Sequence, residues 1–349
     1  MKHSFGSKVV KFRVPIFIIC LLLLIPSAIG YFNTRVNYDI LSYLPKDIDT
    51  MKGQDILVDQ FGTGAFSLVI VNDMEDKDVA TLRNKLEKVE HVNKVLWYDS
   101  FMDISIPTSI LPEKVYNEFN AKGSTLMAVI FDDTTSADAT MEAITNIKEV
   151  SGKQCMVSGM SAVVTDIKDL SERETPIYVL IAVLCSLAVL FLTMDSFLVP
   201  ILFLVSIGFA IIFNLGTNFF LGEISYITKA LAAVLQLGVT MDYSIFLWHS
   251  FQEEQQKTDD DKEAMKHAIN NTIVSVTGSS ITTVAGFVAL CFMSFTLGMD
   301  LGVVMAKGVV FGVLCCVTIL PSLILIVDKG RKKMQHKKLM PSLDRPMRF

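Results

Sequence analysis

The sequence has few of the residues that build metal sites and disulfides. Its 349 residues include five histidines and six cysteines, with no Cys-x-x-Cys pair and no closely spaced histidines. Cys155 is the only cysteine in the segment 33–175, so no disulfide can form inside that segment. A nucleophile elbow and a phosphate-binding loop are also missing. We therefore expect no enzymatic activity, no metal or cofactor and no nucleic-acid partner.

Apolar residues, by contrast, are abundant and are gathered in blocks. They make up 51 % of the chain, and a membrane span needs roughly 20 of them in a row. Six blocks meet this need, and their backbone must satisfy its own hydrogen bonds in lipid, which predicts helices. The blocks are 14–32, 176–194, 197–219, 225–248, 272–293 and 301–327. The other five cysteines fall in these blocks, where we expect lipid-facing thiols.

The first block has two interpretations. Lys8, Lys11 and Arg13 precede an apolar run that ends near Ser27, as in a cleaved secretory signal. The apolar run continues beyond Pro26, however, which favours a retained membrane anchor. The predicted organisation is thus 1–32 for the amino terminus and first span, 33–175 for a water-facing domain, 176–328 for five further spans and 329–349 for a basic tail.

The distribution of lysine and arginine predicts the orientation. Basic residues flank the first span, follow the fourth span at Lys257, Lys262 and Lys266, and recur in the tail. The positive-inside rule then places both termini in the cytoplasm and residues 33–175 outside. That segment holds 14 basic and 24 acidic residues, a net charge of −10, whereas the remainder has a net charge of +5. Its acidity is compatible with this topology but does not decide it.

The water-facing segment alternates strand and helix patterns. Runs rich in β-branched residues predict strands, and apolar residues spaced by three and four predict helices. Strands are expected at 65–71, 92–98, 124–131 and 154–158, with helices from Asp78 and at 137–150, the latter capped by Ser136. The order βαββαβ predicts a ferredoxin-like α+β domain. A short helix at 112–121 and a polar helix at 160–174, leading into the span at Pro176, are also expected.

One acid within a span is the strongest candidate for chemistry. Asp242 lies about two-thirds along the fourth block, where a carboxylate costs several kcal/mol unless it faces protein or water. A carboxyl group that gains and loses a proton at this depth suits a proton-coupled machine. Tyr243 can donate a hydrogen bond to it, and Gly238 allows a neighbouring helix to approach closely. A packing role for Asp242 is the alternative.

Weaker candidates lie in the last two spans. Thr282 and Thr283 are placed to continue a hydrogen-bond path from Asp242, or simply to pack. Asp300 and Lys307 share a face of the sixth span, and we expect Lys307 to reach towards Asp300 or the outer surface. His249 is expected at the membrane interface, and residues 253–267 form a charged, helix-prone stretch that is expected to be a solvated or interfacial helix.

The whole pattern resembles the resistance–nodulation–division (RND) superfamily, and within it the amino-terminal half of MMPL-type lipid and drug exporters. The similarity rests on Asn37–Pro45, on Leu237–Leu247 with its Gly-Val-Thr-Met-Asp-Tyr-Ser motif, and on Thr282–Leu290. The resemblance implies export of lipidic or amphiphilic compounds across a bacterial plasma membrane, with protons as the coupling ion. It assigns Asp242 and Tyr243 to the proton relay, and the water-facing domain to the porter.

The chain departs from this family in its length, because family members usually have twelve spans and a second porter domain. No internal repeat supplies a second half here. Three interpretations stay open: two copies pair about a two-fold axis, the chain pairs with a separate half, or the chain is truncated. Expected partners are therefore membrane lipids, a hydrophobic substrate, and a second copy or half.

Two other functions remain possible from the sequence. A Sec-type protein-export accessory subunit has the same half-size layout, but its fourth-span motif runs Asp-Ala-Asn, whereas Tyr243 and Ser244 follow Asp242 here. A non-transporting membrane scaffold or sensor is the second alternative, and it should tolerate the loss of Asp242.

Overall fold

The computed structural model describes residues 4–61, 64–100, 117–328 and 330, and it divides into two compact units. Residues 1–36 and 173–349 form the membrane unit, and residues 37–172 form the second unit. Helix α7 (Met160–Thr193) passes through the boundary as one helix with Pro176 inside it. The polar segment 160–174 is therefore the first part of this helix and not a separate element.

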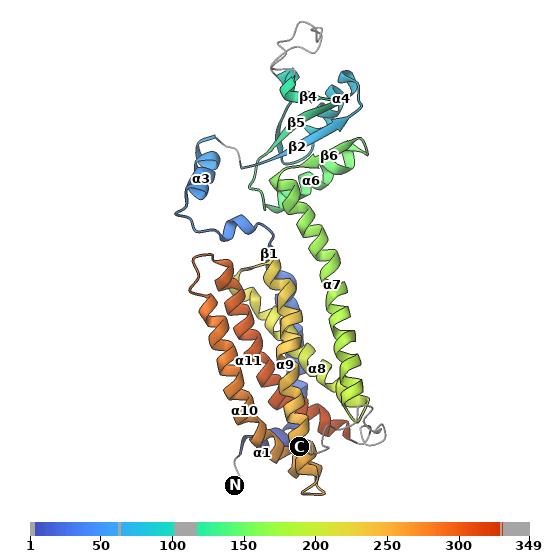
Figure 1. The fold of residues 1–349 in the computed structure, drawn as a ribbon, viewed down its shortest axis with the longest axis vertical. Helices are drawn as coiled ribbons and strands as arrows, with labels where there is room; N and C mark the ends of the chain where they lie inside the picture. Colours follow the sequence, from blue (N-terminus) through green and yellow to red (C-terminus); the bar gives the residue numbers. More distant parts are fainter. Residues whose placement is uncertain (1–3, 62–63, 101–116, 329, 331–349) are drawn as a thin grey trace, which may run out of the picture. The chain divides into compact units, whose positions relative to one another are not determined.

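The membrane unit contains six helices long and apolar enough to cross a membrane, as the sequence predicted. Helices α8, α9, α10 and α11 run side by side, and α2 packs against α8 and α11 (Figure 1). Besides α7, the spans are α2 (Arg13–Asn33), α8 (Leu198–Gly216), α9 (Tyr226–Gln255), α10 (Asp261–Leu290) and α11 (Leu297–Ile326). A 3-10 turn, η4 (Thr217–Leu221), extends α8. The stretch 253–267 is not a separate interfacial helix, because it comprises the end of α9, a turn and the start of α10.

Close contacts at glycines hold these helices together. A methyl group on Gly30 of α2 would lie 2.2 Å from the carbonyl oxygen of Gly216 in α8. On α11, a methyl group on Gly302 would lie 2.5 Å from the carbonyl oxygen of Phe287 in α10, and one on Gly312 would lie 2.1 Å from Cγ2 of Thr240 in α9. Such contacts let backbones approach where lipid offers no hydrophobic driving force. Helix α11 consequently has the most buried span of the six.

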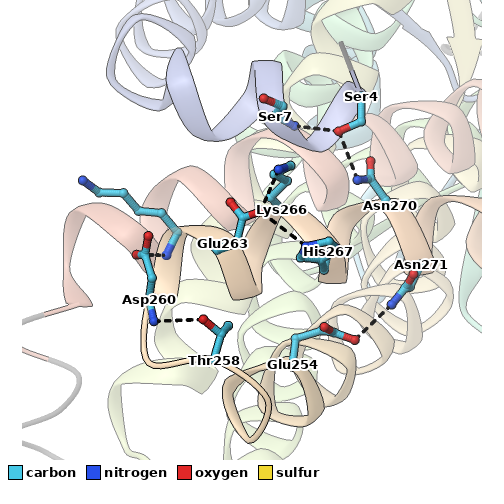
Figure 2. A network of polar contacts seen from close by, with 11 residues as sticks. Ser4, Ser7, Glu254, Thr258, Asp260, Glu263, Lys266, His267, Asn270 and Asn271 are labelled. Carbon is cyan, nitrogen blue, oxygen red and sulfur yellow. Dashed lines mark hydrogen bonds and ion pairs between the residues drawn. The ribbon is translucent and has the colours of Figure 1, made fainter. Parts of the chain in front are cut away.

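A short amino-terminal helix, α1 (Phe5–Lys11), is fixed to the start of α10 (Figure 2). The side chain of Asn270 accepts a hydrogen bond from the backbone N–H of Gly6 at 3.1 Å and donates one to the Ser4 hydroxyl, also at 3.1 Å. Gly6 has no room for a side chain, since a methyl group there would lie 2.5 Å from the Lys266 carbonyl oxygen. Val9 and Val10 of α1 are buried in the main apolar core of the bundle. Helix α1 thus belongs to the folded bundle.

The second unit contains a sheet with strand order β3-β5-β2-β6, in which all neighbouring strands are antiparallel. Strand β2 (Ala65–Asn72) pairs with β5 (Ser124–Phe131) from Ala65 opposite Phe131 to Asn72 opposite Ser124. The remaining elements are β3 (Val92–Leu96), β4 (Asn120–Ala121), β6 (Cys155–Ser158), α3 (Asp49–Phe61), α4 (Asp76–Leu86) and α6 (Asp138–Ser151), with 3-10 turns η1 (Ile40–Tyr43) and η2 (Tyr98–Ser100). Side chains from the sheet, α4 and α6 form one apolar core that includes Trp97, Phe131 and Ile144.

Several local predictions for this unit need correction. Within the segment predicted as a helix at 112–121, residues 117–119 are helical, residues 120–121 form the strand β4, and residues 112–116 lie outside the described part. The cap of α6 is Ala137 and not Ser136, and its side chain makes no capping bond. Strand β3 ends at Leu96, because the chain turns into η2. Helix α3 was not predicted. The basic tail, 329–349, lies outside the described residues apart from Gly330.

Candidate functional site

Asp242 lies on α9, in the second half of a helix whose start is well defined. Ser225 caps this helix, because its hydroxyl accepts a hydrogen bond from the backbone N–H of Ile227 at 3.2 Å. The side chain of Asp242 is exposed on the surface of the membrane unit. Among the described residues, no hydrogen bond or ion pair to its carboxylate is present. An acid in a span is therefore without a hydrogen-bond or ion-pair partner in the part of the chain that the structure describes.

Tyr243, the next residue, points the other way into the bundle. It is 3 % exposed and belongs to the main apolar core. Its phenol lies near the Thr283 side chain on α10 and near Asp242. The pair predicted from the sequence is therefore split between the surface and the core, and Tyr243 connects the acid to the neighbouring helix.

Exposed small residues occur on α9 near Asp242 and on the neighbouring helix α10. Gly238, one turn earlier on α9, is exposed, and no atom lies within 4 Å of the position its side chain would take. The same holds for Gly278 and Gly286 on α10. We call the exposed residues Gly238 and Asp242 of α9, with Ser275, Gly278, Ser279, Thr282 and Gly286 of α10, the α9–α10 face. The close helix approach expected at Gly238 is not made within the described chain.

Thr282 and Thr283 have different surroundings. The hydroxyl of Thr282 is exposed and donates to the Ser279 carbonyl within its own helix at 2.7 Å. The Thr283 hydroxyl donates to the same carbonyl at 3.2 Å, and its side chain lies near the Tyr243 phenol. Only Thr283 is thus brought to the predicted pair, whereas Thr282 lies on the open face.

Lys307 was expected to reach towards Asp300 or the outer surface, and within the described residues it forms no ion pair with Asp300. Oδ2 of Asp300 accepts hydrogen bonds from the backbone N–H of Ser225 at 2.8 Å and from the Thr228 hydroxyl at 2.6 Å. Its negative charge thereby stabilises the start of α9. Lys307 Nζ instead donates to Oδ1 of Asn218 in η4 at 2.6 Å. Asp300 thus has its partners at the start of α9, whereas Lys307 has its partner just after the end of α8.

Sequence reasoning missed a buried cluster of amides between α8, α9 and α11. The Asn214 side chain donates to Oε1 of Gln236 at 3.0 Å, and the Gln236 side chain donates to the Gly308 carbonyl at 3.1 Å. Asn214 and Gln236 are 1 % and 2 % exposed. Gly308 has no room for a side chain beside them. Polar residues at buried helical positions were the available signal, but the sequence alone does not say which helices face each other.

A sequence comparison identifies the class of protein. The profile of the MMPL family matches residues 127–345, which is more than half of the chain. The chain therefore belongs to the MMPL family. The matched region contains α9 and α10 with Asp242, Tyr243 and Thr283. Family membership and the six apolar helices of the described residues together support a multi-pass membrane protein.

Individual relatives are distant and longer. Membrane protein YdfJ of Bacillus subtilis is 21 % identical over 365 residues, covering 98 % of this chain and 49 % of that protein. The apo-petrobactin exporter of Bacillus anthracis is 22 % identical, covering 88 % of this chain and 42 % of that protein. The siderophore exporter MmpL5 of Mycobacterium tuberculosis is 24 % identical over 58 % of this chain. The chain thus spans at most about half the length of these relatives.

One similarity to a solved structure concerns the fold. The crystal structure of SecDF, a translocon-associated membrane protein from Thermus thermophilus, superposes on 92 % of this chain with a TM-score of 0.50 and 16 % sequence identity. This chain covers 38 % of that protein. At this identity the likeness describes the arrangement of helices and strands only.

Proposed function

We propose that this chain is one half of a proton-driven exporter of the RND superfamily, MMPL type, for lipidic or amphiphilic compounds. The observation that carries the proposal is Asp242 in a span of a bundle, with the buried Tyr243 linking it to Thr283 on the next helix. Protons are the coupling ion, and Asp242 takes them up and releases them. Family membership supports the same assignment, as do two relatives that are exporters, MmpL5 and the apo-petrobactin exporter.

The exposure of Asp242 implies that another protein surface covers it. Lipid tails cannot solvate a carboxylate, and polar groups in spans almost always face a bundle interior or a water-filled path. The α9–α10 face offers small residues that permit close helix packing around the acid. We propose that a second copy of this chain, or a separate half, packs on this face and brings a second acid towards Asp242.

The second unit is proposed to be the porter domain with a ferredoxin-like fold. Its order of elements, βαββαβ with the strand order β3-β5-β2-β6, supports that assignment. We place this unit outside a bacterial plasma membrane and both termini in the cytoplasm. The lysines between α9 and α10 and the basic residues around α1 support this orientation through the positive-inside rule.

Vesicles with an imposed pH gradient test the proposal. The chain is reconstituted, and both the efflux of a fluorescent amphiphile and the movement of protons are recorded. Asp242→Asn should abolish gradient-driven efflux while the protein remains assembled, because an amide cannot carry the proton. Glu253→Gln is the matched control, since Glu253 is an exposed acid near the end of the same helix. Equal efflux by the wild type and Asp242→Asn would refute the proposal.

A Sec-type accessory subunit is the second candidate, and the likeness in fold to SecDF is the observation that favours it. The Tyr-Ser sequence after Asp242 does not match the Asp-Ala-Asn motif of those proteins. A non-transporting scaffold is the third candidate. The Asp242→Asn variant separates it from a transporter, because a scaffold would keep its function.

A further inference from the structure

Lys307 is a cation in a span with only a neutral partner in the described part of the chain. Its ammonium group donates to Oδ1 of Asn218 at 2.6 Å, and its side chain is partly buried. No described carboxylate forms an ion pair with it, and Asp300 is bound elsewhere. Removing the Lys307 charge from water without a counter-charge is energetically costly. This cost directs attention to its neutral partner, Asn218, and to the groups around it.

The lysine fixes the orientation of the Asn218 amide. An ammonium group only donates hydrogen bonds, so the oxygen of this amide must face Lys307 and its nitrogen must face the other way. The Asn218 side chain is fully buried, and its Nδ2 has no hydrogen-bond partner among the described residues. Asn218 thus presents a buried donor that lacks an acceptor.

A small cavity lies beside this amide. It has room for about one water-sized group, and its wall contains Asn218 together with Lys229 at the start of α9 and Tyr31 at the end of α2. The Lys229 ammonium lies 5.4 Å from the centre of the Tyr31 ring. The remaining wall is formed by Thr34, Val36, Leu215 and Ile224.

The polar side chains of this wall include the donors Lys229 and Asn218, and none of them is a carboxylate. Lys229 and Asn218 supply N–H groups, while the Thr34 hydroxyl already donates to the Gly30 carbonyl at 2.7 Å. The acids at this end of the bundle, Asp300 and Glu223, are not part of the wall. An anionic oxygen would satisfy the Asn218 amide and pair with Lys229, and charge-assisted hydrogen bonds of this kind are strong.

We propose that this cavity, which we call the Asn218 site, binds one anionic oxygen of an amphiphile, either a carboxylate or a phosphate. Lys229 and Asn218 bind the oxygen, and Lys307 orients Asn218. Val36, Leu215 and Ile224 contact the first carbons of the apolar tail. The site would select acidic amphiphiles over neutral ones. That these amphiphiles are exported substrates rests on the proposed function. The size of the cavity admits the anionic oxygen and not a whole headgroup.

Equilibrium binding to the full chain in nanodiscs of zwitterionic lipid tests the site without any gradient. The probes are a fluorescent polyene fatty acid and the matching fatty alcohol, which has the same tail and no charge. The acid should bind about tenfold more tightly than the alcohol, as expected for one charge-assisted hydrogen bond. Equal binding of acid and alcohol would overturn the proposal.

Three variants assign the effect to the site. Lys229→Met should lower the affinity for the acid about tenfold and leave the alcohol unchanged, while Lys229→Arg should restore the preference. Asn218→Asp should abolish binding of the acid, because it replaces the donor with a second negative charge. Lys257→Met, at the other end of α9, is the matched control and should change neither ligand. A preference that persists in both Lys229→Met and Asn218→Asp would place the acid elsewhere.

The source of the anion is decided by competition. If millimolar acetate or inorganic phosphate displaced the fatty acid as well as unlabelled fatty acid does, the site would bind free anions, and the amphiphile assignment would be wrong. Failure of the exporter proposal is a separate result. Normal transport by the Asp242→Asn variant would refute proton coupling. The binding measurement at the Asn218 site would be unaffected by that result, because it needs no proton gradient.

Discussion

The amide cluster and the α9–α10 face are two polar regions of one bundle. They differ in whether their polar side chains have hydrogen-bond partners on other helices. Asn214, Gln236 and the Gly308 carbonyl satisfy one another between three helices and are buried. Asp242 has no hydrogen-bond or ion-pair partner among the described residues and is exposed, as is Gly238 one turn earlier. The first region fixes the fold of the chain, whereas the second is expected to need a surface from outside it. Disturbing each region should therefore change different properties.

The largest loss of stability is expected at Gly312, where a side chain would collide with Thr240. Gly312→Val should lower the free energy of unfolding by about 3 kcal/mol, because overpacking forces the two helices apart. The measurement is chemical unfolding in detergent micelles.

Gly238→Val provides the contrast, since nothing lies near Gly238. Its free energy of unfolding should change by less than about 1 kcal/mol, consistent with the helix propensities of the two residues. Its assembly with a second copy or half, measured by cross-linking in vesicles, should be impaired. A large loss of stability at Gly238 would contradict the difference between the two regions.

Removal of one member of the amide cluster should have the next largest effect. Gln236→Leu leaves the buried Asn214 amide nitrogen without its acceptor and removes the bond to the Gly308 carbonyl, at a cost of about 2 kcal/mol. Thermal unfolding in detergent measures this loss. The paired variant Asn214→Leu with Gln236→Leu should recover part of it, and strict additivity of the two single losses would show that the amides do not act as one cluster.

Tyr243 joins the core to the open face, so its hydroxyl should matter more for function than for stability. Tyr243→Phe should reduce gradient-driven efflux about tenfold and the free energy of unfolding by only about 1 kcal/mol, the usual net value of one hydrogen bond. Both quantities are measured on the same reconstituted preparation. Unchanged efflux would remove Tyr243 from the relay.

The smallest effect on stability is expected at Thr282, whose hydroxyl bonds only to its own helix. Thr282→Val should change the free energy of unfolding by less than about 0.5 kcal/mol, as is usual for surface substitutions. Thr283→Val, on the side towards Tyr243, is the comparison in the same turn of α10. If Thr282→Val were the more harmful of the two for efflux, the path would run along the surface and not through Tyr243.

The prediction from the sequence succeeded where the signal is local. Long apolar runs predicted the six spans found among the described residues, and runs rich in β-branched residues predicted the strands β2 and β5 to within about one residue. Helix α3 and the short strand β4 were missed. Strand β1 (Arg35–Asn37) was also missed because it pairs with β7 (Glu223–Ser225), almost 190 residues further along the chain. Pairing at such a distance leaves no local pattern.

For the candidate site, the sequence by itself determined which polar and charged residues fall within the apolar runs, and it predicted that they carry the chemistry. Asp242, Tyr243 and Lys307 stand out because charge and polarity are costly in an apolar run. Only the tertiary structure decided their partners. It turned Tyr243 inward, left Asp242 on an open face, and separated Lys307 from Asp300 by giving each a partner near the start of α9 or the end of α8. The physical reason is that residue spacing fixes the face of a helix, whereas packing between helices distant in sequence fixes what that face contacts.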